Sequence, residues 1–351
     1  MLRPIDFLNA PCFALYRLPN TGKVYALSAS RADEVVGGID RVGEREGFFI
    51  APYDAAKYPP LFIPAEKSAR FNGATLPNEL KQLSGYEESD RELYMNDFAA
   101  VHRALCLGRA MKMVLARRVR LRLVAYSLEM LRVFGAACKH YPHNYIALWH
   151  TPQTGTWLTA TPELLLSMNG ERRCQTMALA GTMLGNNDKA LFLSGWSRKN
   201  IEEQRLVQQH IFHVLGDFGV PYQVGRLHIV PSGNLLHLRT DFSFPAPQSI
   251  ALLLDLLHPT PAVCGMPVRS AKVLCAELEH IDRLYYAGYT GPVAADGTFS
   301  FFVTLRCLHV VDQGCDLYAG SGILQASTAD EEWEETERKL NALRALLPLF
   351  G

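Results

Sequence analysis

Short apolar stretches separated by glycine, proline and asparagine dominate the first ninety residues of the chain. The clearest of them lie at residues 12–18, 23–28, 47–52 and 60–64. Short apolar runs bounded by turn residues are typical of the strands of an antiparallel sheet. This part carries no residue pattern with recognisable chemistry, so we expect residues 1–90 to serve as scaffold.

The rest of the chain alternates between helical and strand-like patterns. Apolar residues at helical spacing predict helices at residues 89–107, 126–140, 188–215, 249–257 and 270–282. Strand-like runs lie at residues 111–117, 144–149, 157–159, 173–180, 222–230, 235–242 and 300–311. Neither a G-x-G-x-x-G sequence nor a P-loop accompanies these elements, which argues against a nucleotide-binding fold.

The last strong pattern, at residues 318–339, joins small residues to an acidic helix. We predict a turn at residues 319–322 and a helix from about Thr328, where T-A-D-E has the spacing of a capping box. Glu335 and Lys339 are four residues apart and share one face of this helix, which by itself could be a solvated ion pair. Beside a glycine-rich turn, however, such a pair suits an anion together with a metal ion. We therefore interpret this stretch as one wall of an active site.

Composition narrows the class of protein. The 351 residues are 48% hydrophobic and 20% charged, as in a soluble globular protein, and 35 basic side chains balance 35 acidic ones. The zero net charge and the lack of a basic run argue against nucleic-acid binding. The longest apolar run, residues 250–257, is too short to span a membrane, and we find no signal peptide. Eight scattered cysteines without a CxxC pair predict reduced thiols, a cytoplasmic protein and no zinc site.

Two ionisable residues stand in apolar surroundings. Lys112 begins the strand M-K-M-V-L-A; such a lysine usually reaches solvent, but in a closed pocket desolvation would lower its pKa and make it a usable base. Glu163 lies between a proline and three leucines; it could be exposed at a turn, whereas burial would raise its pKa and make it a usable acid.

Four further residues are candidates for ligand binding. Gly181 and Thr182 follow a strand, where a glycine permits close approach of the backbone to a ligand. His237 lies on a strand, where a lone histidine is more often a core residue than a catalyst. Arg306 stands among apolar neighbours, and a buried arginine needs an anion from the protein or from a substrate.

Together these stretches resemble the chorismate-utilising enzymes, which include isochorismate, salicylate, anthranilate and aminodeoxychorismate synthases. The matching segments between Lys112 and Lys339 are TPELLL, ALAGT, KNIEEQRLV, LLHLRT, HPTPAVCGMP, DRLYYAGYTG, VTLR, YAGSGI and EEWEETERK. The resemblance implies one large α/β domain of the α+β type over residues 1–351, with two stacked antiparallel sheets flanked by helices. All the motifs fall within residues 91–351.

The resemblance also implies roles for individual residues. Glu203 and Glu335 match magnesium ligands, Lys112 the general base that activates water, and Glu163 the general acid. The positions that would bind substrate are Gly181, Thr182, His237, Tyr286, Arg306, Gly320 and Lys339. Such a set suits chorismate, a dianion, because a neutral protein must supply Mg²⁺, Arg and Lys locally.

Among these enzymes the chain is most similar to isochorismate synthases, which convert chorismate to isochorismate by attack of water on the ring with loss of the 4-hydroxyl. The product would feed menaquinone or siderophore synthesis. Ala180 stands where aminodeoxychorismate synthases typically have a lysine, and we find no tryptophan-binding motif of the anthranilate synthases before Lys112. We therefore expect a monomer or weak dimer that needs no amidotransferase.

Three alternatives stay open: a salicylate synthase, an anthranilate synthase component I and an inactive, ligand-binding paralogue. The chain also departs from the family pattern. Gln204 replaces a frequent histidine, Ala178 a frequent proline and Ser321 a frequent alanine, and the arginines that often follow the AGT motif are absent.

Overall fold

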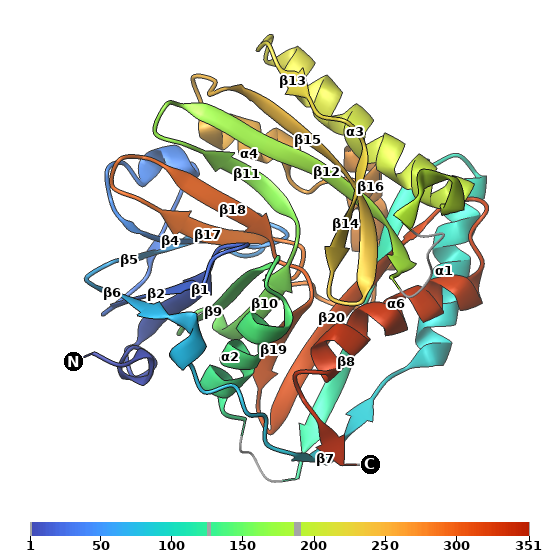
Figure 1. The fold of residues 1–351 in the computed structure, drawn as a ribbon. Helices are drawn as coiled ribbons and strands as arrows, with labels where there is room; N and C mark the ends of the chain where they lie inside the picture. The colour runs from blue at the N-terminus through green and yellow to red at the C-terminus, as the bar shows by residue number, and fades with distance from the viewer. Residues whose placement is uncertain (1, 125–127, 186–190, 351) are drawn as a thin grey trace.

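Two stacked sheets with helices around them organise the chain, as the sequence predicts (Figure 1). The structure, a computed structural model, describes residues 2–124, 128–185 and 191–350. Neighbouring strands in this part of the chain pair antiparallel, except that β21 runs parallel to β7.

The first sheet holds eleven strands within the described residues, and β16 pairs with β8 beside the main path. In spatial order they are β21 (Leu349–Phe350), β7 (Leu83–Glu88), β8 (Lys112–Leu123), β20 (Gly314–Ile323), β19 (Cys307–Val311), β10 (Gly155–Thr161), β9 (Tyr145–Thr151), β1 (Cys12–Arg17), β2 (Lys23–Ala29) and β6 (Lys67–Asn72), with β16 at Gly265–Met266.

The second sheet holds ten strands in the same ranges, and β14 pairs with β15 beside the main path. In order they are β13 (Gln223–Val224), β15 (Leu235–Pro245), β12 (Arg173–Leu184), β11 (Leu164–Met168), β18 (Phe299–Val303), β17 (Tyr289–Val293), β4 (Gly47–Ala51), β5 (Leu61–Pro64) and β3 (Asp33–Glu34), with β14 at His228–Ser232. The α-helices are α1 (Arg91–Cys106), α2 (Met130–His140), α3 (Arg198–Asp217), α4 (Ile250–Leu257), α5 (Val268–Leu278) and α6 (Ala329–Arg344).

Burial on both faces explains why β1, an interior strand of the first sheet, is a nearly continuous apolar run. All six residues of β1 are buried. Ala14 and Tyr16 belong to the core between the sheets, whereas Phe13 and Leu15 belong to a second core on the opposite face, with Phe134 of α2. Alternate residues of a strand point to opposite faces, so a strand covered on both sides is apolar throughout.

A crossing between the sheets replaces the single strand predicted at residues 300–311. The structure divides this stretch into β18, in the second sheet, and β19, in the first. Between them Arg306 takes a left-handed conformation with φ of 45°, which is uncommon for a residue other than glycine. The prediction was wrong because apolar residues continue through the crossing, from buried Val303 at the end of β18 to buried Cys307 and Leu308 at the start of β19.

The predicted turn at residues 319–322 is also wrong, because these residues are the interior of β20, paired along its length with β8. The helix after it begins at Ala329 with Thr328 as the N-cap residue, close to the predicted start. The Thr328 hydroxyl donates to Glu331 Oε2 at 2.8 Å instead of accepting a backbone N–H, so the capping box does not form.

Other boundaries shift by a few residues. The helix predicted at 270–282 runs from Val268 to Leu278, and the sequence pattern missed β6, β7 and β11. The helices predicted from 126 and from 188 begin at Met130 and at Arg198, and their predicted first residues lie outside the described ranges. The N-cap residue Ser197, whose side chain accepts from Asn200 N at 3.2 Å, explains the later start of α3.

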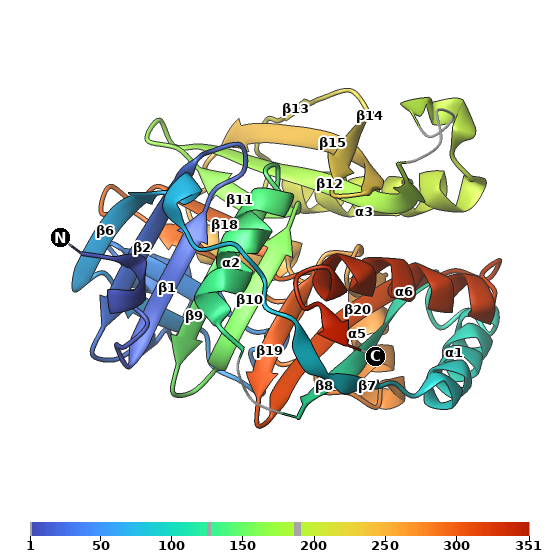
Figure 2. The ribbon, with the colours of Figure 1, turned by 60° about the horizontal axis from the view of Figure 1, so that its bottom comes forward.

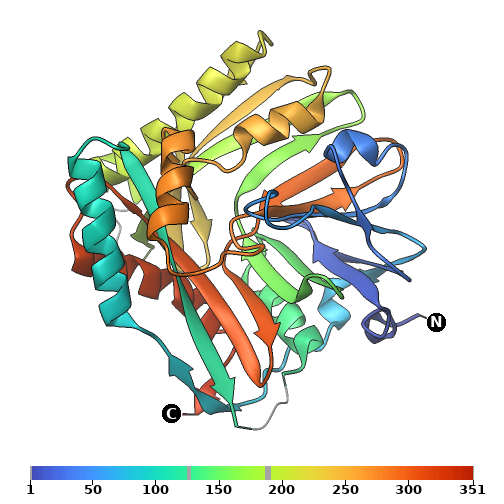
Figure 3. The same ribbon diagram turned by 180° about the vertical axis from the view of Figure 1, so that it is seen from behind.

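The layers bring distant segments together at one end of the molecule. Figure 2 shows β12, β15 and α3 in the upper layer, facing β20 and α6 in the lower one. On the far side of β8, helices α1 and α5 cover the strand (Figure 3). Motif residues that are up to 227 positions apart therefore meet between these two layers.

Candidate active site

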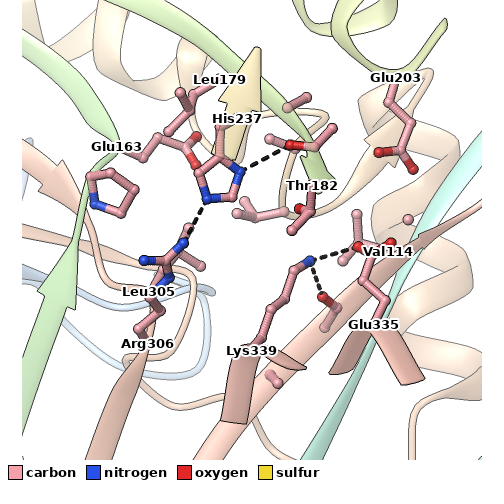
Figure 4. A pocket seen from close by; sticks show the side chains of 18 of the residues that line it. Val114, Glu163, Leu179, Thr182, Glu203, His237, Leu305, Arg306, Glu335 and Lys339 are labelled. Carbon is pink, nitrogen blue, oxygen red and sulfur yellow. Dashed lines mark hydrogen bonds and ion pairs between the residues drawn. The ribbon is translucent and has the colours of Figure 1, made fainter. Parts of the chain in front are cut away.

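One pocket between the two layers gathers every residue that the sequence marked as a site residue. Its walls come from β8 and β20 below, from β12, β15 and α3 above, and from α6 at the side. The predicted residues that line it are Lys112, Glu163, Gly181, Thr182, Glu203, His237, Tyr286, Arg306, Gly320, Glu335 and Lys339. Figure 4 shows Glu163, His237 and Arg306 on one side of the pocket, with Glu203 and Glu335 on the other.

Lys112 and Glu163 are the two candidate proton-transfer groups, and both are buried. Lys112 is 2% exposed, and its Nζ has no hydrogen bond or ion pair within the described residues. Glu163 is 3% exposed and accepts a weak hydrogen bond from Thr260 Oγ1 at 3.3 Å. Burial raises the pKa of the Glu163 carboxyl to about 7, although Thr260 and the nearby lysines act in the opposite direction. This carboxyl therefore carries its proton up to neutral pH.

A β-bulge positions the ring of His237. The register between β12 and β15 shifts from Ala180 to Met183, and Gly181 takes a left-handed φ of 71°. The Gly181 carbonyl, at the interruption in strand pairing, lies 2.9 Å from His237 Nδ1. Because a carbonyl can only accept, Nδ1–H donates to it, and Nε2 of the neutral ring is an acceptor. Burial, aided by the charge of Arg306, lowers the pKa of His237 to about 3, so the ring is neutral.

Arg306 points into the pocket from the crossing between the sheets. Its Nη2 donates to His237 Nε2 at 2.6 Å, and its Nη1 donates to Ser232, whose hydroxyl in turn donates to Asn144 Oδ1 at 2.9 Å. Burial lowers the pKa of Arg306 to about 10, which leaves it charged at neutral pH. In the described structure no carboxylate pairs with this guanidinium, so its charge is available to an anion in the pocket.

The predicted ion pair of α6 is present at the pocket edge. Lys339 Nζ donates to Glu335 Oε1 at 2.9 Å and to the carbonyl of Gly320 at 2.7 Å. Burial alone would raise the pKa of Glu335, but the ammonium groups of Lys339 and Lys199 outweigh it and hold the pKa at about 2. Glu335 is therefore a carboxylate at any physiological pH.

Comparison with known proteins agrees with this geometry. The family model described as "Chorismate binding enzyme" matches residues 65–348. The chain belongs to this family of chorismate-binding enzymes. The match takes in all the elements that line the pocket.

Curated relatives are named isochorismate synthases. EntC of Escherichia coli strain K12 is 36% identical over 218 residues, which is 58% of this chain and 54% of that protein. DhbC of Bacillus subtilis is 28% identical over 321 residues, covering 84% of this chain and 79% of that protein. The chain spans about half the length of several of the curated relatives that it matches.

Solved structures share the fold. MenF, the menaquinone-specific isochorismate synthase from Escherichia coli, superposes with a TM-score of 0.84 at 21% identity, covering 97% of this chain and 90% of that one. A DhbC from Bacillus anthracis gives a TM-score of 0.82 at 22% identity, with 96% of each chain covered. The two-sheet architecture predicted from the sequence is thereby confirmed.

The departures from the family pattern lie mostly outside the pocket. Gln204 donates to the carbonyl of Ala178 at 3.1 Å, so both of these residues join α3 to β12. Ser321 faces away from the pocket, and its hydroxyl lies 2.9 Å from the hydroxyl of Tyr94 on α1. Ala180 does line the pocket. The missing arginines after the AGT motif concern a segment that lies partly outside the described residues.

Two residues that were not predicted as site residues lie beside the predicted glutamates Glu203 and Glu335. Glu332 is fully buried one turn before Glu335, and Lys199 stands one turn before Glu203 on α3. Their spacing of three and four residues from the marked glutamates was the available signal, since such residues share a helix face.

The carboxylates near α3 and α6 fit a hard cation. Glu203 Oε1 and Glu332 Oε2 are buried and have no hydrogen-bond partner among the described residues, and oxygen ligands of this kind are what Mg²⁺ prefers. Residues 2–124, 128–185 and 191–350 nevertheless hold no three acidic, His or Cys side chains already gathered as a metal site. The same described ranges contain no helix that is long and apolar enough to cross a membrane.

Proposed function

We propose that this chain is an isochorismate synthase that converts chorismate to isochorismate with Mg²⁺. The observation that carries the proposal is the pocket itself. In it lie Glu163, whose pKa is raised by burial, and Lys112 and Arg306, neither of which pairs with a carboxylate of the described residues. The names of the relatives in the family support the same reaction.

The substrate is a dianion, and the pocket offers matching charges. The guanidinium of Arg306 binds one carboxylate, oriented by its hydrogen bonds to His237 and Ser232. The ammonium of Lys339 lies at the opposite edge, where Gly320 and Glu335 hold it. A divalent cation held by Glu203 and Glu335 would neutralise a substrate carboxylate there when bound.

The two proton-transfer groups divide the chemistry. The Lys112 amine takes a proton from the attacking water, and the Glu163 carboxyl gives one to the departing hydroxyl. One water adds to the ring and one leaves, so the reaction is an isomerisation. Because Glu163 holds its proton near neutral pH, it can act as the acid without a partner.

Water is the nucleophile in this proposal, and no amidotransferase is needed. Ala180 presents a methyl group to the pocket where an aminating relative would present a lysine, so no side chain there captures an amine. Incubation in ¹⁸O-water should place the label in the new hydroxyl of isochorismate. Faster formation of an aminated product with ammonium salts would reverse the assignment.

The decisive test is incubation of the purified protein with chorismate and Mg²⁺, with chromatographic separation of isochorismate, salicylate, anthranilate and pyruvate. We expect isochorismate alone, loss of turnover in EDTA and recovery when Mg²⁺ is added in excess. Salicylate with pyruvate would identify a salicylate synthase, which shares the first step. Bound but unconverted chorismate would identify an inactive paralogue, and full turnover in the chelator would remove the metal from the mechanism.

A further inference from the structure

Lys199 lies among three buried carboxylates in the described structure. Its Nζ is 2.6 Å from Glu332 Oε1, 3.5 Å from Glu335 Oε2 and 3.9 Å from Glu203 Oε1. Glu203 and Glu335 are the two proposed magnesium ligands. The ammonium therefore lies within 3.9 Å of an oxygen from each of the three carboxylates.

The surroundings of Lys199 indicate that these carboxylates, and not its own helix, hold it there. Lys199 is the second residue of α3, and a cation is disfavoured near the positive N-terminal end of a helix. Burial lowers the pKa of Lys199, but the carboxylates of Glu335, Glu203 and Glu332 outweigh it and raise the pKa above its usual value. Its side chain is 24% exposed, so the flexible stem has an open path toward solvent.

The net charge of this cluster changes if the Lys199 side chain moves out of it. Three carboxylates with the ammonium groups of Lys199 and Lys339 sum to one negative charge, which becomes two negative charges when Lys199 leaves. Two negative charges match a divalent cation. Two of the carboxylate oxygens, Glu203 Oε1 and Glu332 Oε2, are buried without a hydrogen bond even while Lys199 is in place.

We propose that Lys199 is an internal counter-ion that competes with the divalent metal for Glu203, Glu332 and Glu335. Metal binding then requires Lys199 to withdraw, and the competition weakens the affinity of the substrate-free protein for Mg²⁺. This inference rests on the proposed magnesium site. It makes Lys199 a positioning residue that controls occupancy of the site.

Metal affinity without chorismate tests the proposal. Mg²⁺ binding is measured by titration calorimetry, and Mn²⁺ binding by the electron paramagnetic resonance signal of the free ion, for the native chain and for Lys199→Met. We expect the variant to bind either ion about tenfold more tightly or better, because one competing charge has been removed. Lys199→Arg keeps the charge and should gain no affinity. Lys272→Met, which breaks a surface pair with Asp54, is the matched control and should bind as the native chain does.

Thermal unfolding gives a second readout that does not depend on turnover. In EDTA the Lys199→Met protein should melt below the native chain, and added Mg²⁺ should raise its Tm by more than it raises the native Tm. If that variant fails to fold, Lys199→Gln, which keeps a polar side chain, takes its place. Unchanged or weaker metal binding by the variant, or no binding by either protein, would overturn the inference. Tighter binding without any isochorismate formation would sustain it while refuting the proposed function.

Discussion

Within the described residues, the buried side chains of Lys112 and Glu163 differ from those of Arg306 and Lys339 in having few or no hydrogen bonds. Arg306 and Lys339 also line the pocket, but their hydrogen bonds fix them in place, as expected of groups that bind carboxylates. The Nζ atom of Lys112 has no such contact within the described residues, and the Glu163 carboxyl has a single weak one. At the scale of the residue, the environment thus separates groups that hold the substrate from groups that exchange protons with it.

Removing either proton-transfer group should lower kcat with little effect on substrate affinity. We expect Lys112→Ala and Glu163→Gln each to lower kcat by ~10²–10⁴-fold, the usual share of general acid–base catalysis. Both variants should remain folded. Steady-state kinetics of these two variants and of Lys339→Ala tests the distinction between proton transfer and substrate binding. Lys339→Ala should mainly raise KM. A variant of Lys112 or Glu163 with near-native kcat and a raised KM would show that its residue binds substrate instead.

The raised pKa of Glu163 also predicts a pH dependence of stability. The folded carboxyl has a pKa of about 7, against 4.5 for an unperturbed one, so between these values the unfolded chain loses its proton and the folded chain keeps it. The free energy of unfolding should therefore fall as pH rises from 4.5 to 7, by up to about 3 kcal/mol, relative to Glu163→Gln. Urea denaturation of both proteins at several pH values measures the difference. A constant difference across this window would contradict the assigned pKa.

At the scale of the element, the glycines of β20 make room for side chains of the pocket and do not form a turn. A Cβ on Gly322 would collide with Glu203 Oε1 and would lie 2.7 Å from Lys112 Cε. A Cβ on Gly320 would lie 2.9 Å from the hydroxyl of Tyr286. Glycine in this strand therefore leaves room for side chains that reach over it from α3, β8 and the segment before β17.

Gly322→Ala should consequently damage catalysis more than folding. The new methyl group pushes Glu203 and Lys112 aside, and we expect kcat to fall by about 10²-fold, as for a misplacement of around 1 Å. The matched control is Gly216→Ala in α3, where no atom lies within 4 Å of the added Cβ and helix propensity favours alanine by about 1 kcal/mol. Steady-state kinetics of both variants measures the effect on catalysis, and Tm measures the effect on folding. Equal activity of the two would mean that the pocket tolerates a side chain at Gly322.

At the scale of the whole molecule, Arg283 joins segments that are far apart in the sequence. It donates to the carbonyl of Val263 at 2.6 Å and to that of Val114 at 2.8 Å, and it pairs with Glu279, whose Oε1 accepts from Ala116 N at 2.9 Å. Both members of the pair are almost fully buried. The pair therefore ties β8, which carries Lys112, to the loop before β16 and to the end of α5.

Arg283→Met should cost the fold about 3–5 kcal/mol, because it leaves the buried carboxylate of Glu279 without its partner. Arg205→Met, which breaks an exposed pair with Glu202, is the control and should cost less than about 1 kcal/mol. Urea denaturation of the two variants gives both values. A similar, small loss in each would show that Arg283 does not hold β8, the loop before β16 and the end of α5 together.

Sequence alone determined what depends on neighbours along the chain. The apolar runs predicted β1, β2, β4 and β5, helix α6 begins one residue after its predicted N-cap, and Glu335 pairs with Lys339 at the predicted spacing of four. The motifs identified the family and hence the stacked sheets. These features follow from short-range geometry, periodicity and recognisable local patterns, all of which are visible without a fold.

Only the tertiary structure decided what depends on residues far apart. The glycines of β20 looked like a turn until β8 and α3 packed against them, and Arg306 looked like part of a strand until the chain crossed between sheets there. The neutral His237, the protonated Glu163 and the three carboxylates around Lys199 each depend on partners from other elements. Desolvation and charge pairing act through space, so no pattern along the chain could assign them.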